Sequence, residues 1–277
     1  MPGFVLPAAY ALFVWWFSTG LILLLDHLPA RTYRWSMLGG TALFLISLWQ
    51  LRVLSADTSL PGAYAAFTYG VLAWGWQEMS FFMGYLTGTR RSGCPRQCHG
   101  WRHFRHGVEA CLYHELAIIG TAWVIVAENW GASNQVGTWT FLLLWGMRQS
   151  AKLNLFLGVR NLGEQFLPPH LGYLRSFMTK KPMNKLLPVS VLTGSVLAAL
   201  LAARAASPGI GEAAATGLTF LVTMLILAVL EHLTLVLPLP FERLWSWVLT
   251  WRRPGPLQHR AATGAGGARH ELRILLP

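Results

Sequence analysis

Seven long apolar runs divide the chain, and short polar or basic segments separate them. A helix that crosses a bilayer needs roughly 20 mainly apolar residues, because each residue adds only about 1.5 Å to its length. The pattern therefore predicts an all-α fold, a polytopic transmembrane helix bundle of about seven spans. The predicted spans cover residues 4–25, 36–55, 62–86, 108–128, 137–157, 187–206 and 216–237.

The distribution of Lys and Arg predicts how this bundle is oriented. With seven spans, alternate connections share one side of the membrane. One side receives only Arg52 and Arg204, whereas the other side and the C-terminal tail receive 18 basic residues. Cytoplasmic loops carry the excess of Lys and Arg in membrane proteins. We therefore expect the N-terminus outside and the C-terminus in the cytoplasm of a bacterial inner membrane.

Composition agrees with a membrane protein and argues against a nucleic-acid partner. Hydrophobic residues make up 54% of the chain and charged residues 12%, about half the charged share of a soluble domain. The net charge of +11 resides in loops between apolar runs, where basic residues meet anionic lipid headgroups. The lipid bilayer, and not nucleic acid, is the partner that this charge indicates.

The same pattern predicts one structured domain and a tail. Residues 1–253 contain all seven spans, and the long loops 87–107 and 158–186 lie on the predicted cytoplasmic side. Residues 254–277 are rich in Gly, Ala, Pro and Arg, a composition typical of a disordered basic segment. Cys94 and Cys98 fall in a cytoplasmic loop, where thiols stay reduced, so we expect no disulfide.

Ionisable residues inside the predicted spans are the main functional candidates, because charges in a bilayer are costly. Counting residues from the helix ends places most of them at one level, in the cytoplasmic third of the membrane. A buried polar or ligand-binding pocket would comprise Glu78, His114, Glu115, Arg148, Lys152, Asn154, Glu231 and His232.

Two interpretations of this set remain open. Arg148 and Lys152 lie one helical turn apart and repel each other, so anions must lie close to them. Either protein carboxylates supply these anions as interhelical ion pairs, or a bound anionic ligand does. Proton or ion transport is less favoured, because no span is visibly broken and no inverted repeat appears.

Possible metal ligands gather just before the fourth span. The run from Cys94 to Glu115 is rich in Cys, His and Glu, and the metal candidates are His103, His106 and Glu109. Their spacing departs from common patterns, because Cys-x3-Cys is unusual for zinc and the paired His-His of membrane di-iron enzymes is missing. We therefore expect that Cys94 and Cys98 are not obligatory metal ligands and that the segment is a basic loop at the headgroups.

Four segments resemble a known family. The longest is Asn134–Phe177, NQVGTWTFLLLWGMRQSAKLNLFLGVRNLGEQFLPPHLGYLRSF. The others are WQEMSFFMGYLTGTRR at Trp76–Arg91, YHELAIIG at Tyr113–Gly120 and KPMNKLLPVSV at Lys181–Val191. Together they are similar to the PuhE-type photosynthetic-complex assembly family of phototrophic proteobacteria, over roughly residues 5–240.

The resemblance implies a location and a process. Such proteins are encoded among photosynthesis genes and are linked to building the reaction centre or its light-harvesting antenna and to bacteriochlorophyll supply. It implies an assembly factor of the intracytoplasmic membrane that binds a nascent reaction-centre or antenna subunit, or a bacteriochlorophyll-type tetrapyrrole pigment, without catalytic residues. The alternative is a metal-dependent, for example di-iron, membrane enzyme acting on a bacteriochlorophyll or carotenoid precursor.

Overall fold

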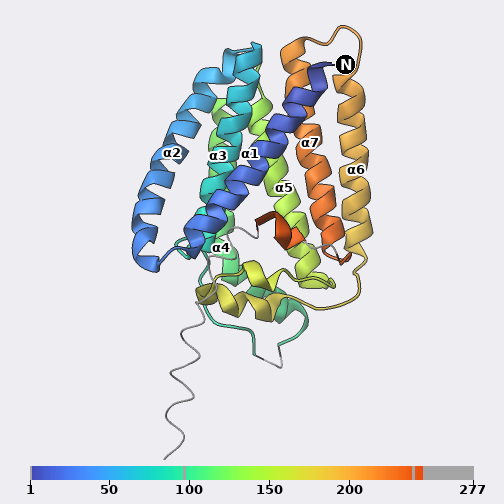
Figure 1. Cartoon of the computed structure of the whole chain (residues 1–277). Coiled ribbons are helices and arrows are strands. Elements are labelled where there is room, and N and C mark those ends of the chain that lie inside the picture. Colours follow the sequence, from blue (N-terminus) through green and yellow to red (C-terminus); the bar gives the residue numbers. More distant parts are fainter. Residues whose placement is uncertain (1, 96–97, 239–240, 246–277) are drawn as a thin grey trace, which may run out of the picture. The chain divides into compact units, whose positions relative to one another are not determined.

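The computed structural model describes residues 2–95, 98–238 and 241–245 (Figure 1). Over these residues the chain is helical and has no strand, only an isolated bridge between Val159 and Lys180. The all-helical prediction is therefore confirmed. The described helices are α1 (Pro2–His27), η1 (Ala30–Thr32), α2 (Tyr33–Val53), η2 (Leu54–Ala56), α3 (Leu60–Phe82), α4 (Gly100–Glu128), α5 (Val136–Leu157), η3 (Glu164–Phe166), η4 (Pro169–Phe177), α6 (Leu186–Ala205), α7 (Glu212–Thr234) and η5 (Phe241–Trp245).

Five of these helices are long and apolar enough to cross a membrane: α1, α2, α4, α6 and α7. The remaining long helices, α3 and α5, have 23 and 22 residues and are not among these five. Arg148 and Lys152 both belong to α5. A helical membrane bundle is thus supported, whereas the number of seven spans stays a prediction.

The chain separates into two units, residues 1–241 and 242–277. In the second unit the structure describes only residues 242–245, which end the short 3-10 helix η5. The tail predicted at 254–277 lies outside the described residues. Cys94, Cys98 and Cys111 are free thiols, as expected.

Alternate connections of the bundle meet at opposite ends (Figure 1). At one end, Asn134 of the α4–α5 connection donates from Nδ2 to the carbonyl oxygens of Asp57 and Gly62, at 2.9 and 3.2 Å. At the other end, Asn161 of the α5–α6 connection donates to the carbonyl oxygens of Thr234 and Leu237 beside α7. The long connections lie at this second end, which we call the loop end, opposite the N-terminus (Figure 1).

Helix α3 is central to the packing. About half of its residues are buried, and it contributes to both hydrophobic clusters of the bundle. In one, Trp74 packs edge-on against Phe141 of α5, and in the other, Phe67 stacks on Phe220 of α7. Helices α3 and α5 pack against each other (Figure 1), so the polar side chains that they carry can pair between helices.

Two helix boundaries differ from those predicted. Helix α4 begins at Gly100, two turns before the predicted 108, because its first turns are polar and basic and extend beyond the apolar run. Helix α3 ends at Phe82 and not near 86. The cause is Gly84, whose φ of 80° allows the chain to turn while Tyr85 N donates back to Ser80 O at 3.0 Å, a Schellman-type helix end.

Candidate functional site

An ion pair joins α3 to α5 towards the loop end. Arg148 Nη2 of α5 lies 3.0 Å from Glu78 Oε2 of α3, with side chains 29% and 14% exposed. The guanidinium also lies over the ring of Phe82, 5.7 Å from its centre. Because α3 and α5 pack directly against each other, these two side chains can meet between the helices. Arg148 therefore has a protein carboxylate as its partner.

A second ion pair joins α5 to α4. Lys152 Nζ lies 2.5 Å from Glu115 Oε1, and Gln149 Nε2 donates to the other oxygen of the same carboxylate. Lys152 also lies 5.7 Å from the centre of the Phe81 ring. The two bases of α5 are thus neutralised by acids from two different helices. This geometry favours the interpretation in which the protein supplies the anions.

A neutral hydrogen-bond network lies beside the ion pairs and links α5, α6 and α7. The Ser150 hydroxyl lies 2.9 Å from both the Ser190 hydroxyl and His232 Nε2. His232 Nδ1 donates to the Ala228 carbonyl at 2.8 Å, and the Ser150 hydroxyl donates its proton to Ser190 Oγ. Asn154 Nδ2 donates to Ser190 Oγ at 3.1 Å. His232 and Asn154 are both buried.

His114 and Glu231 lie apart from these contacts. His114 is fully buried against the Phe81 ring, and neither ring nitrogen has a hydrogen-bond partner among the described residues. Glu231 lies on an exposed side of α7 and interacts with Trp15. The eight predicted pocket residues are therefore spread over two ion pairs, one hydrogen-bond network and two separate positions. That they bind a ligand stays a prediction.

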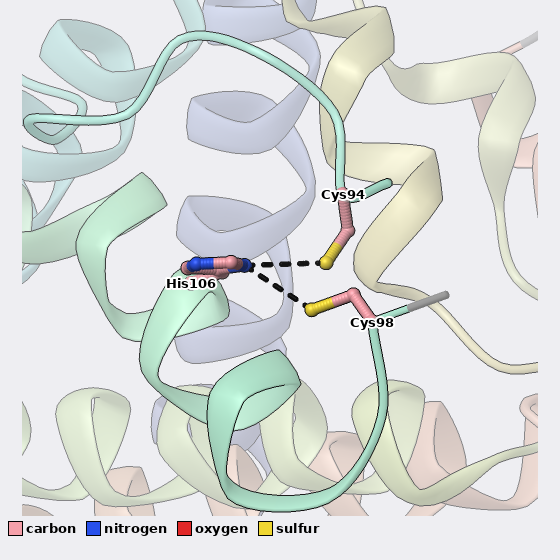
Figure 2. A group of neighbouring side chains, drawn as sticks. All are labelled: Cys94, Cys98 and His106. Atoms are coloured by element: carbon pink, nitrogen blue, oxygen red, sulfur yellow. Dashed lines mark hydrogen bonds between the residues drawn. The ribbon is translucent and has the colours of Figure 1, made fainter. Parts of the chain in front are cut away.

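A cluster of thiols and imidazoles lies where the α3–α4 connection meets α4. Cys94 Sγ and Cys98 Sγ approach His106 Nδ1 at 3.4 and 3.2 Å, and the three donor atoms all lie within 4.8 Å of one another. Figure 2 shows both sulfurs pointing at the same edge of the imidazole. His103 Nδ1 lies 3.2 Å from Cys94 Sγ. We call these four residues the thiol–imidazole cluster.

Residues of two elements, η4 and α5, contact the cluster. Cys94 N donates to Ser176 Oγ of η4 at 2.8 Å. The His103 ring stacks on Phe156 of α5 and lies beside Phe177 of η4, at centroid distances of 5.2 and 5.8 Å. Cys98 is buried and Cys94 partly buried. Burial, together with the neighbouring Cys98, raises the pKa of the Cys94 thiol to about 11.

Of the three predicted metal candidates, His103 and His106 belong to the cluster and Glu109 does not. The Glu109 carboxylate pairs with Arg90 and Arg105, each at 3.2 Å. Sequence reasoning set Cys94 and Cys98 aside because of their spacing, and the structure brings both to His106. It also missed Gln149, Ser150 and Ser190, whose roles depend on which helices are neighbours.

Comparisons of the sequence with known proteins place this chain in a family. A family model described as "Protein of unknown function (DUF3623)" matches residues 1–255. A protein of Rhodobacter capsulatus, described as an uncharacterized 30.4 kDa protein in the puhA 5′ region, is 36% identical over 248 residues, which cover 88% of this chain and 90% of that protein. No solved structure matches. The extent of both matches shows that the chain belongs to the DUF3623 family.

Proposed function

We propose that the chain is an assembly factor for the photosynthetic apparatus, which binds a nascent reaction-centre or antenna subunit, or its bacteriochlorophyll-type pigment, in the bacterial inner membrane. The observation that carries this proposal is the relative in the puhA 5′ region, which is similar along almost the whole of both chains. The resemblance of Asn134–Phe177 to photosynthetic-complex assembly proteins points the same way.

The polar interior supports binding in preference to turnover. Arg148 and Lys152 are already neutralised by Glu78 and Glu115. By contrast, His114 has two buried ring nitrogens without a hydrogen-bond partner in the described part of the chain. Such groups call for a further partner, which a ligand or water can provide. An imidazole is also a ligand type suited to the metal of a tetrapyrrole.

The loop end offers a surface for a partner. Basic side chains of the α5–α6 connection are exposed there, namely Arg160, Arg175, Lys180, Lys181 and Lys185. A groove of about 610 Å³ opens beside them and is lined by Leu157, Lys181, Met183, Asn184, Lys185, Leu186 and Pro188. Its mixture of amines and apolar side chains suits a segment that carries both acidic and apolar groups.

The enzyme alternative receives less support from the site. Di-iron centres need several carboxylates together with imidazoles, whereas the thiol–imidazole cluster contains none. Glu109, the acid that sequence reasoning placed with it, is held by Arg90 and Arg105. A set of two thiols and two imidazoles is typical of structural sites.

The proposed orientation places the loop end in the cytoplasm, with seven spans and the N-terminus outside. Two observations support this orientation. The connections alternate between the two ends of the bundle, and Lys and Arg are in excess at the loop end, as is usual for cytoplasmic loops. Reporter fusions at Asp57 and Ala132 should then be active in the periplasm, and fusions at Arg175 in the cytoplasm. A periplasmic signal at Arg175 would refute the seven-span orientation.

The proposed partner surface predicts a difference between two charge reversals. In a phototrophic host that lacks the gene, wild-type protein should restore the near-infrared absorption of reaction-centre and antenna complexes. Lys180→Glu/Lys185→Glu should restore clearly less, because it repels an acidic partner at the loop end. Arg204→Glu, a change at an exposed residue in the last turn of α6, at the other end of that helix, is the control. Equal restoration by all three proteins, at equal abundance, would exclude the loop end as the partner surface.

A further inference from the structure

The thiol–imidazole cluster has the donor set and the spacing of a metal centre. A tetrahedral zinc ion, with Zn–S of about 2.3 Å and Zn–N of about 2.0 Å, holds its sulfur and nitrogen ligands about 3.5 Å apart. The sulfur–nitrogen distances of the cluster are 3.2, 3.2 and 3.4 Å. The donor atoms of Cys94, Cys98 and His106 all lie within 4.8 Å of one another, whereas His103 lies outside this group of three and approaches Cys94.

Hydrogen bonding alone explains this convergence less well. A neutral imidazole nitrogen has either one proton or one lone pair. His106 Nδ1, however, is approached by Cys94 Sγ and Cys98 Sγ together, and Figure 2 shows both sulfurs directed at that nitrogen. A cation between the three atoms would satisfy all of them at once. It would also convert the two buried thiols into thiolates.

We infer that Cys94, Cys98 and His106 bind Zn²⁺ and that the neighbouring His103 imidazole completes a tetrahedral site. His103 and His106 lie three residues apart in the first turns of α4, so both imidazoles project from one side of the helix. Cys94 and Cys98 approach from the α3–α4 connection. Two sulfur and two nitrogen ligands select Zn²⁺ over hard cations such as Mg²⁺ or Ca²⁺, which prefer oxygen.

The charges of the site fit its basic surroundings. Two thiolates neutralise one Zn²⁺, and the two imidazoles are neutral, so the loaded site carries no net charge. This suits a segment that also contains Arg90, Arg102 and Arg105. Four protein ligands leave no open position for substrate, which makes the site structural.

The position of the site indicates what the metal would hold together. The backbone nitrogen of Cys94 also donates a hydrogen bond to Ser176 Oγ of η4, and the His103 ring stacks on Phe156 of α5. Zinc would therefore fasten the α3–α4 connection to α4, with the α5–α6 connection against it. Zinc would also stabilise the folded arrangement of these connections at the loop end. A metal that binds the folded state and not the unfolded state adds its binding free energy to the stability of the fold.

The test is metal analysis of the full chain, purified in detergent without a polyhistidine tag and without chelators. We expect stoichiometric zinc in the wild type and almost none in Cys94→Ser/Cys98→Ser. Cys111→Ser is the matched control, because that thiol lies on α4 outside the cluster and contacts the Gly107 carbonyl. It should retain its zinc. His106→Ala should lose most of the metal, and His103→Ala should release it at lower chelator concentrations.

A second measurement does not depend on the folding of variants. Wild-type protein loaded with Co²⁺ should show thiolate-to-metal charge-transfer absorption and the strong visible bands of a tetrahedral site. Removing zinc from the wild type with a chelator should make the chain more sensitive to trypsin at Arg90 and Arg91 of the α3–α4 connection and at Arg102 in the first turn of α4. Substoichiometric zinc in the wild type, or a Co²⁺ spectrum without thiolate absorption, would overturn the inference.

Discussion

Replacing Arg148 with Ala should lower the thermal stability of the detergent-solubilised protein by about 4–8 °C, corresponding to about 2 kcal/mol for a chain of this size. The substitution leaves Glu78, which is only 14% exposed, as a charge without its partner. Breaking a fully buried pair costs about 3–5 kcal/mol, and the 29% exposure of Arg148 reduces that cost. The midpoint of heat-induced precipitation measures the effect.

The second variant separates ion pairing from ligand binding. Arg148→Ala/Glu78→Gln removes the orphaned charge and should recover much of the lost stability. Arg175→Ala is the control, because the Arg175–Glu164 pair is 3.7 Å long and about half exposed. Its loss should lower the midpoint by at most about 2–4 °C, since exposed pairs contribute roughly 0–1 kcal/mol. If Arg148→Ala were fully stable but failed to support photosynthetic complexes, a ligand anion and not Glu78 would be its functional partner.

A methyl group at Gly137 should destabilise the bundle by about 1–3 kcal/mol, the usual cost of overpacking. Gly137 and Gly70 bring the backbones of α5 and α3 together, as small residues commonly do between membrane helices. A Cβ at Gly137 would lie 2.7 Å from the Ala66 carbonyl oxygen, and a Cβ at Gly70 would lie 2.8 Å from the Gly137 carbonyl oxygen. Backbone atoms cannot move aside as a flexible side chain does, so α3 and α5 must separate.

Gly146 provides a matched control on the same helix. A Cβ there meets no atom within 4 Å, and alanine is the better helix former by about 1 kcal/mol. Gly146→Ala should therefore leave stability unchanged or raise it slightly, whereas Gly137→Ala and Gly70→Ala lower it. Monodispersity on size exclusion after heating ranks the three variants. Equal behaviour of Gly137→Ala and Gly146→Ala would show that α3 and α5 do not approach as closely as described.

Apolar run length predicted the helices well because each run is bounded by polar or turn-forming residues. The predicted 137–157 and 187–206 correspond to α5 (Val136–Leu157) and α6 (Leu186–Ala205). Prediction was poorer where helix and apolar run differ. Helix α4 extends beyond its apolar run into a polar, basic segment, and Gly84 ends α3 while apolar residues continue. The glycine at 84 was a readable stop signal.

The candidate site was harder to predict, since its contacts depend on which helices are neighbours. Counting from helix ends placed Glu78, Glu115 and Lys152 at one level and Arg148 slightly deeper, and the structure pairs these four residues. The sequence did not tell which acid meets which base. Helical spacing also suggested that His103 and His106 lie together, but Cys94 and Cys98 reach them through a connection whose path is fixed by Ser176, 82 residues after Cys94.

The most direct test of the proposed function is the identity of what the protein holds in its own membrane. Affinity-tagged full-length chain should be purified from cells that have just been shifted to phototrophic growth, with pulse-labelled proteins and bound pigments identified. We predict that newly made reaction-centre or antenna subunits, or a bacteriochlorophyll-type pigment, co-purify early and decline as mature complexes accumulate. Purification of the intact chain with neither subunit nor pigment at any time after the shift would contradict the assembly role.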